Sequence, residues 1–238
     1  MNNLRLFIVI SIIIILITIT INSLHETKLD INKYTNLSED GYIILLNKPS
    51  NEEILSYLPK DYVFMNYKYV IKGCSLSTYH RDVTSSQYEF KTKYPVYTYI
   101  WYKNNGELLS LCPGSHKTVP YCYSRPKILT APENTGVIFN CDVLHAGALN
   151  KFGDERHAEQ YKIIHIQDYD KLIKLDGIQK VKHGNCNINI TYEYISRKIS
   201  LLFPYFFNHI LTPYLQEKQD SFVGKVVETI YARDFYNK

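Results

Sequence analysis

The sequence lacks the patterns that would place it in several common functional classes. Its five cysteines include no C-x-x-C pair, which excludes a zinc ribbon and a thioredoxin-like redox site. No H-E-x-x-H segment occurs, so a zinc hydrolase with a general-base Glu beside a ligand is not indicated. No run of Lys and Arg alternates with aromatic residues, and the net charge is only +4, so we expect no nucleic-acid partner.

The composition also excludes a disordered or repetitive protein. Hydrophobic residues make up 45% of the chain and charged residues 21%, a balance typical of globular proteins. No internal repeat or low-complexity tract occurs after residue 23. The 238 residues are long enough for one sizeable domain, and a single all-β barrel can use that length alone.

A long hydrophobic run stands at the amino terminus. Leu6 to Ile21 carries no charge, and as a helix it would span roughly 24 Å, slightly less than the ~30 Å hydrocarbon core of a bilayer. We expect residues 1–23 to form an uncleaved transmembrane signal-anchor, because the run exceeds a usual signal-peptide core and no A-x-A-like site follows it. Arg5 precedes the run, so the positive-inside rule predicts a single-pass membrane protein whose C-terminal domain is luminal or extracytoplasmic. The alternative is a cleaved signal peptide and a secreted protein.

Both routes export the domain. The sequons that begin at Asn36 and Asn189 are compatible with export. In an oxidising compartment Cys112 and Cys122 are candidates for a disulfide, although spacing alone does not decide the pairing.

The middle of the chain carries β signals. Residues 24–50 look like a polar linker leading into a first strand at 41–46, and a short helix is expected from Asn51 until Pro59 ends it. The pair Asn105-Gly106 is a strong hairpin signal. Further strands are expected at 62–72, 97–103, 107–112, 136–141 and 159–167. Many short strands with Gly and Pro turns predict a mostly β domain, a sandwich or jelly roll, over residues 51–170.

The last part of the chain changes character. Residues 171–238 are predicted to form a mostly helical extension, with a strongly apolar stretch from Tyr192 to Leu215 and an amphipathic helix from Lys218 to Tyr236. We expect these helices to pack on the outside of the β domain. A second membrane contact through Leu201 to Phe207 is the alternative.

One group of residues points to metal chemistry. His80 and Asp82 form an H-x-D step, and residues i and i+2 of a strand face the same side. His145 follows the strand at 136–141 and is the predicted third ligand. Two histidines and one carboxylate on one face of Fe(II) leave positions open for O₂ and a chelating cosubstrate. Arg156 then enters the next strand, where a guanidinium could pair with a carboxylate of that cosubstrate.

Other residues near these motifs have weaker roles. The H-x-E step from His157 to Glu159 has no strand-and-turn series after it to bring a third ligand back. His116 is expected to be a turn residue rather than a metal ligand. Tyr99 shares a face of its strand with Trp101, and if that face lines the barrel we expect Tyr99 to contact the cosubstrate.

Two segments resemble the phytanoyl-CoA dioxygenase family. The segment YKNNGELLSLCPGSHK, residues 102–117, is similar to that family's N-G hairpin and PGSH-K stretch. The segment GVIFNCDVLHAGALNKFGDERHA, residues 136–158, is similar to its closing segment, where a strand precedes the second metal His and an R-x-A step follows. The resemblance implies a double-stranded β-helix fold with flanking helices, iron on His80, Asp82 and His145, and 2-oxoglutarate held at Arg156. It also implies a dioxygenase that hydroxylates a substrate with release of succinate and CO₂, with ascorbate as a further reductant.

Three other functions stay open beside this one. A catalytically inactive, membrane-anchored jelly-roll binding protein would keep the shape without the chemistry. A zinc hydrolase could use the same three ligands, and a membrane-anchored adhesion protein would need none of them. For the oxygenase itself, a lipid, a peptidyl side chain, a sugar and a small metabolite all remain candidate substrates.

Overall fold

A computed structural model describes residues 9–14, 25–73, 77–82, 84, 90–118, 125–149, 156–183 and 190–205. Residues 9–14 are helical, and the rest of the predicted signal-anchor, like the predicted helix at 218–236, lies outside the described residues. Within the part of the chain that is described, no helix is both long and apolar enough to cross a bilayer.

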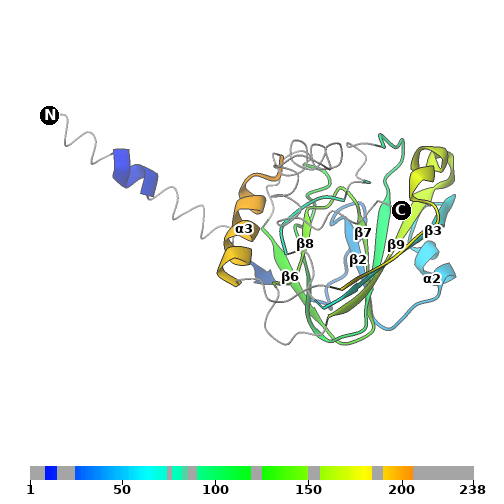
Figure 1. The fold of residues 1–238 in the computed structure, drawn as a ribbon, viewed down its shortest axis with the longest axis horizontal. Helices are drawn as coiled ribbons and strands as arrows, with labels where there is room; N and C mark the ends of the chain where they lie inside the picture. The colour runs from blue at the N-terminus through cyan, green and yellow to red at the C-terminus, as the bar shows by residue number, and fades with distance from the viewer. Residues whose placement is uncertain are drawn as a thin grey trace.

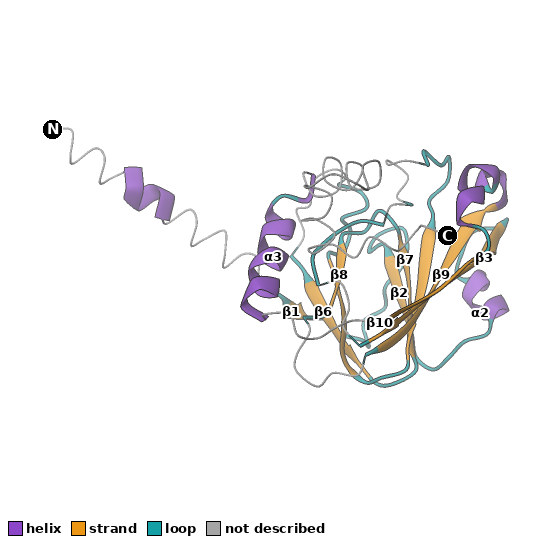
Figure 2. Cartoon of the chain, in the orientation of Figure 1, coloured by secondary structure: helices purple, strands orange, loops and turns teal. Residues whose placement is uncertain are grey.

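Two β-sheets form the body of the domain (Figures 1 and 2). The larger sheet has the strand order β10-β3-β9-β4-β7-β2, and the smaller has the order β1-β6-β5-β8. The strands of the larger sheet are β2 (Tyr42–Leu45), β3 (Tyr62–Lys72), β4 (Tyr97–Tyr102), β7 (Thr135–Asn140), β9 (His157–His165) and β10 (Ile178–His183). Those of the smaller sheet are β1 (Thr27–Lys28), β5 (Gly106–Leu111), β6 (Lys127–Ala131) and β8 (His145–Gly147).

The chain passes repeatedly from one sheet to the other. It runs from β3 in the larger sheet to a bridge beside β8, back to β4, on to β5 and β6, and then alternates through β7, β8 and β9. Neighbours within each sheet are mostly antiparallel, with parallel pairs only at β1–β6 and β10–β3 among the described strands. This alternation is that of a jelly roll. The predicted mostly β, jelly-roll-like architecture is therefore confirmed.

The core lies between the two sheets. Its larger cluster includes Ile100, Val137, Phe139 and Ile164 from the larger sheet and Leu111 from the smaller one. The strand β4 lies between β7 and β9, and all six of its residues are buried. Burial of both faces of β4 removes the apolar–polar alternation that would show which face meets the core.

A second cluster covers the outer face of the larger sheet. There the helix α2 (Asn51–Ser56), capped by the hydroxyl of Ser50 at 3.2 Å from the amide of Glu53, packs its buried Ile54 against the sheet. Tyr99 belongs to this outer cluster. A Cβ at Gly136 would lie 2.7 Å from the Tyr99 ring, so glycine is needed there to let the ring lie flat on β7.

The carboxyl-terminal segment differs from the helical extension that the sequence predicted. After the short 3₁₀ turns η1 (Ile166–Asp168) and η2 (Asp170–Leu175), β10 adds to the edge of the larger sheet parallel to β3. The prediction of helix is wrong for residues 178–183, because their alternating burial fits an edge strand. The helix α3 (Ile190–Leu202) follows and covers the outer side of the smaller sheet, as expected for a helix packed outside the β domain.

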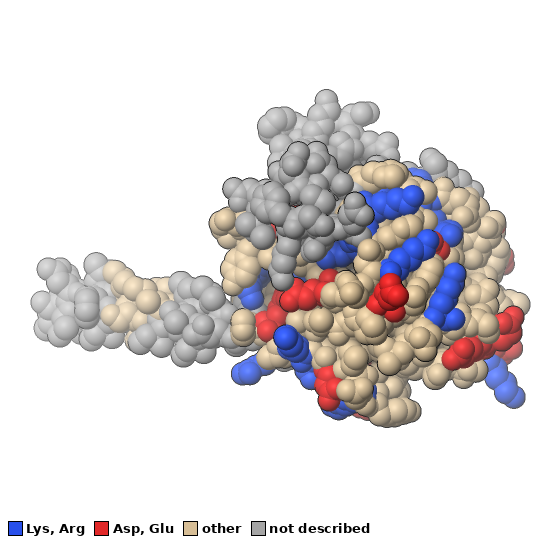
Figure 3. All heavy atoms as spheres, turned by 90° about the horizontal axis from the view of Figure 1, so that it is seen from below, with Lys and Arg blue, Asp and Glu red and all other residues tan. Residues whose placement is uncertain are grey.

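Charges of both signs are interspersed on the surface. On the face shown in Figure 3, Lys and Arg lie among Asp and Glu. The half-exposed lysines Lys68 and Lys103, for example, bind the buried carboxylate of Glu159 with their ammonium groups, at 2.9 Å and 3.1 Å.

Candidate metal centre

The backbone brings His80 and His145 side by side. The amide of His80 donates to the carbonyl of His145 at 2.8 Å, and the amide of His145 donates back at 2.9 Å. The two residues therefore form an antiparallel bridge at the edge of β8. Two residues on, the amide of Asp82 donates to the carbonyl of Cys141 at 3.2 Å, which ties the H-x-D segment to the end of β7. The 65-residue separation along the chain is closed by main-chain hydrogen bonds.

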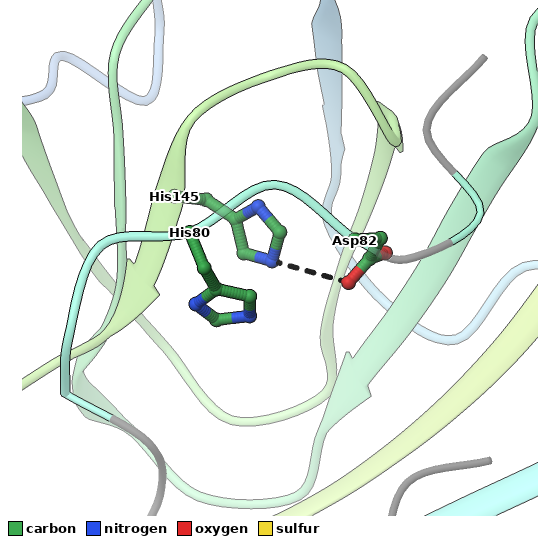
Figure 4. A group of neighbouring side chains, drawn as sticks. All are labelled: His80, Asp82 and His145. Atoms are coloured by element: carbon green, nitrogen blue, oxygen red, sulfur yellow. Dashed lines mark ion pairs between the residues drawn. The ribbon is translucent and has the colours of Figure 1, made fainter. Parts of the chain in front are cut away.

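The side chains converge from this pairing. Donor atoms of His80, Asp82 and His145 all lie within 4.8 Å of one another. Figure 4 shows the two imidazoles next to each other, with the carboxylate of Asp82 facing His145, whose Nε2 lies 3.7 Å from Oδ1 of Asp82. Asp82 and His145 are buried, and His80 is partly exposed, so the open side of the centre is at His80.

Both imidazoles are held in the tautomer that a metal requires. Nδ1 of His80 lies 2.9 Å from the carbonyl of Thr78, and Nδ1 of His145 lies 3.0 Å from the carbonyl of Val143. A carbonyl only accepts, so each Nδ1 carries the hydrogen and each Nε2 keeps its lone pair. A backbone acceptor behind the imidazole is the usual arrangement of metal-binding histidines.

A buried lysine and a threonine hold the third ligand. Lys162 of β9 is fully buried, and its ammonium lies 2.6 Å from Oδ2 of Asp82. The hydroxyl of Thr98 on β4 donates to the same oxygen at 2.6 Å and accepts from Lys162 at 2.8 Å. Oδ1 is left on the side of the histidines.

Burial and neighbouring charges set the protonation of the centre. Burial alone would raise the pKa of Asp82, but Lys162 and the two histidines outweigh it and hold that pKa well below its usual range. Burial would likewise lower the pKa of Lys162, but the charge of Asp82 raises it above its ordinary value. Burial, followed by repulsion from His80, lowers the pKa of His145 to about 4. The centre therefore presents a carboxylate and neutral imidazoles at neutral pH.

Packing fixes the H-x-D segment from behind. The side chain of Arg81, between the two ligands, is buried, and it donates to the carbonyls of Asp142 at 2.7 Å and Ser115 at 3.1 Å. The ring of Phe139 lies 4.5 Å from that of His145 and forms an apolar wall beside the centre. Both contacts limit the positions that the ligands can take.

This donor set fits a divalent transition metal. Two neutral imidazole nitrogens and one carboxylate oxygen on one side of an ion suit non-haem Fe(II) and leave coordination positions open. The fit depends on the side chains alone: the tautomers are set, the carboxylate is ionised, and Asp82 is oriented by two hydrogen bonds to its far oxygen. In the described part of the chain no other group of three or more such ligands occurs.

The remaining predicted residues lie at different places. Arg156, at the entry to β9, is buried and donates to the carbonyls of Ala148 at 3.1 Å and Glu107 at 3.4 Å. Tyr99 points to the outer face of β4, away from the face that carries Thr98, so its predicted contact with a cosubstrate inside the barrel is not supported. The reason is the burial of both faces of β4, which hid the true inner face.

The two residues that the sequence analysis set aside as ligands lie outside the centre. His157 lies 3.6 Å from Oε1 of Glu159, and His116 lies 3.1 Å from the carbonyl of Ser38. Lys162 was missed, although a lysine inside an otherwise apolar strand, Tyr161 to Ile164, is the signal that could have found it.

Comparison with known proteins gives only distant likenesses. Neither a protein-family model nor a curated protein sequence matches the chain. Among solved structures, the carbocyclase SnoK, described as non-heme and alpha-ketoglutarate dependent, has a TM-score of 0.41 at 12% identity, covering 67% of this chain and 97% of SnoK.

Two further structures have similar scores. The endoperoxidase NvfI, described as iron and alpha-ketoglutarate-dependent, has a TM-score of 0.40 at 7% identity, with 54% of this chain and 79% of NvfI covered. EvdMO1 has a TM-score of 0.38 at 11% identity, with 48% of this chain covered, and this chain spans only 30% of EvdMO1. Because these scores are below 0.5, the assignment rests on the strand order and side chains described above: a jelly-roll-like domain with a candidate His-Asp-His metal centre that is open at His80.

Proposed function

We propose that this chain is an Fe(II)- and 2-oxoglutarate-dependent oxygenase that hydroxylates a substrate with release of succinate and CO₂. The observation that carries the proposal is the convergence of His80, Asp82 and His145, with both imidazole Nδ1 atoms occupied by backbone carbonyls. This arrangement is typical of the facial triad of non-haem iron oxygenases. The resemblance of residues 102–117 and 136–158 to phytanoyl-CoA dioxygenases supports the same conclusion.

Bound iron would supply the redox chemistry, activating O₂ as 2-oxoglutarate is oxidatively decarboxylated. The protein's own contribution is geometric. The His80–His145 bridge sets the spacing of the two nitrogen donors, and Phe139 excludes water from the side of His145. Lys162 and Thr98 bind Oδ2 of Asp82 and so favour coordination through Oδ1 alone. A one-oxygen ligand keeps the remaining positions open for the cosubstrate and O₂.

Arg156 is the proposed partner of the distal carboxylate of 2-oxoglutarate. Its guanidinium is held within the protein by the carbonyls of Ala148, just beyond β8, and Glu107 of β5. A buried guanidinium so held offers a planar fork of N–H groups that suits a carboxylate. Lys at this position would keep the charge but lose the fork, so the two residues are not equivalent there.

The proposed enzyme works on the exported side of a membrane. The hydrophobic run Leu6 to Ile21, with Arg5 before it, supports a signal-anchor with the domain luminal or extracytoplasmic. The substrate is then a lipid, a peptidyl side chain or a small molecule of that compartment. Ascorbate is included in the assay below to keep resting iron reduced.

Succinate release tests the proposal. The full-length chain in detergent is supplied anaerobically with Fe(II), then with 2-oxoglutarate, ascorbate and air, and succinate is measured with and without panels of candidate substrates. We expect release that depends on iron and is lost in His145→Ala, with His157→Ala as the matched control because His157 lies outside the centre. Equal release from His145→Ala and wild type would refute the site. Stoichiometric iron binding without any succinate would instead favour the inactive binding protein.

Arg156 is tested separately. In Arg156→Met we expect the KM for 2-oxoglutarate to rise by about tenfold to a hundredfold, the scale of one lost charge-assisted pair. Iron binding should be unchanged, and Arg156→Lys should recover part of the loss. An unchanged KM would remove Arg156 from the cosubstrate site and leave the metal centre intact.

A further inference from the structure

The helix α3 has two faces of opposite character. Its buried face carries Glu193, Arg197, Ser200 and Leu201, at the spacing of one helical stripe. The other face is mostly apolar and exposed, and two aromatic residues that follow the helix, Phe203 and Tyr205, are exposed as well. The large exposed side chains are Tyr194 (49%), Ile195 (50%), Ile199 (42%), Leu202 (37%), Phe203 (58%) and Tyr205 (45%).

The buried face is fixed to the domain by an unusually connected arginine. Arg197 donates to the carbonyl of Ser77 at 2.5 Å, in the segment that carries His80, and to the carbonyl of Gly147 at 2.7 Å, in the strand β8 that carries His145. It also donates to the hydroxyl of Ser110 at 2.6 Å. Leu201 packs against the smaller sheet beside these contacts. These contacts fix the orientation of α3, and they leave its apolar face pointing away from the domain.

The same arginine holds the segment that leads from the hydrophobic run. Nε of Arg197 donates to Oε1 of Glu26 at 2.6 Å, and the hydroxyl of Tyr79 donates to that oxygen at 2.8 Å. Glu26 lies only five residues after Ile21, the last residue of the run. An extended chain covers at most roughly 3.6 Å per residue, so the run ends within roughly 18 Å of Glu26. Any bilayer that holds the run lies next to α3.

We propose that the exposed residues between Tyr194 and Tyr205, on α3 and just after it, dock on the surface of that bilayer. This inference is independent of the oxygenase activity and rests on insertion of the hydrophobic run. The domain would then lie against the membrane with α3 between the lipid and the smaller sheet.

The composition of this face fits a lipid surface. Two tyrosines combine an apolar ring with a polar hydroxyl, as residues at a membrane interface do. Lys198 lies half-exposed on the same side, with its ammonium 5.4 Å from the centre of the Tyr194 ring, and a lysine there can extend its charge to the headgroups. The only acidic residue of α3, Glu193, is buried, so no described carboxylate on this helix faces the lipid.

Tryptophan quenching tests the docking. The full-length chain is inserted into single-copy nanodiscs of phosphatidylcholine, with or without brominated acyl chains, which quench nearby tryptophan. The native chain has one tryptophan, Trp101, which is buried and serves as the common background. Ile199→Trp reports on α3, and Phe203→Trp is a second probe if the first does not fold. Val181→Trp is the matched control, because Val181 is also exposed, at 56% beside 42% for Ile199 and 58% for Phe203, and lies on the edge strand of the other sheet.

The expected result is selective quenching. Emission from Ile199→Trp should fall about twofold in brominated discs. Emission from Val181→Trp should show only the background quenching of Trp101. Adding Ile195→Asp to Ile199→Trp should restore the emission. Ile13→Trp verifies that the run is inserted. Quenching at Ile13→Trp without quenching on α3 would overturn the proposal, since the run would then be inserted while the face of α3 stays away from the lipid. Absence of quenching at both sites, or equal quenching at Val181→Trp, would overturn it too. Succinate release by the same variants shows separately whether the proposed activity holds.

Discussion

Replacing Lys162 by methionine should destabilise the metal-free protein far more than the metal-bound protein. Lys162 is fully buried, and its ammonium is 2.6 Å from Asp82, which is only 4% exposed. Methionine keeps the length and volume of the side chain but leaves the carboxylate of Asp82 buried without its cation. Breaking a buried pair from one side costs about 3–5 kcal/mol. For a chain of this size that corresponds to a fall in Tm of roughly 6–20 °C.

A bound divalent cation replaces the missing positive charge, so it should recover most of this loss. The assay is thermal unfolding of wild type and Lys162→Met with chelator and with Mn(II), a redox-stable substitute for Fe(II). We expect the Tm gain on adding Mn(II) to be larger in the variant than in wild type. This follows because a ligand that binds only the folded state stabilises it by linkage.

A double-mutant cycle isolates the pair. Asp82→Asn removes the buried negative charge that Lys162→Met leaves unpaired. The double variant should therefore be more stable without metal than Lys162→Met alone. Two results would refute the reasoning: a loss below about 1 kcal/mol in Lys162→Met, or a loss that the metal leaves unchanged.

Four other predictions follow from the structure. His80→Ala should lower bound Fe(II) or Mn(II) from one equivalent to near none, measured by metal analysis after gel filtration, whereas His157→Ala should keep it. Tyr99→Phe should leave the KM for 2-oxoglutarate unchanged within error, because Tyr99 faces α2; a large rise would restore it to the cosubstrate site. Burial would raise the pKa of Glu159, but hydrogen bonds, first of all that from Lys68, lower this pKa to about 2. The ionised carboxylate therefore stabilises the folded state above the pKa of the unfolded chain, near 4.5, and this stabilisation is lost as the pH falls toward 2. Glu159→Gln should thus cost about 1 kcal/mol at pH 7, a figure reduced for the half-exposed lysines, and the Tm difference from wild type should shrink between pH 4.5 and 2. Arg197→Met should weaken metal binding as well as the fold, because it releases both the segment before His80 and the strand that carries His145. Arg197→Lys should recover part of each in metal titrations and thermal unfolding.

The sequence predicted the elements that carry their own local signal. The pair Asn105-Gly106 marks the turn between β4 and β5, but the predicted hairpin is wrong, because these two strands belong to different sheets and do not pair with each other. The strand β3 begins and ends at the predicted residues, Tyr62 and Lys72. The metal ligands were also predictable. An H-x-D step beside a strand places His80 and Asp82 on one face, and the strand before His145 supplies the third donor.

What the sequence could not predict depends on which face of a strand is covered. All six residues of β4 are buried, so periodicity placed Tyr99 and Thr98 on opposite faces without showing which of them faces the interior, and only the packing of α2 shows it. Lys162 escaped for a related reason, since a lone lysine in a strand is usually exposed and only the partner Asp82 explains its burial. Apolar and polar residues alternate only weakly in the sequence of β10, and this strand forms because the edge of β3 is available to pair with it.

The bridge between His80 and His145 has a consequence for the order of events during synthesis. The first two donors leave the ribosome before the third. Asp82 is fixed only when the end of β7 reaches it, and His80 only when β8 arrives to pair with it. A nascent chain therefore offers iron only an H-x-D pair, which holds a metal loosely. Tight capture must wait until the barrel has nearly closed, and loading of the ion then becomes a late checkpoint that reports a completed domain.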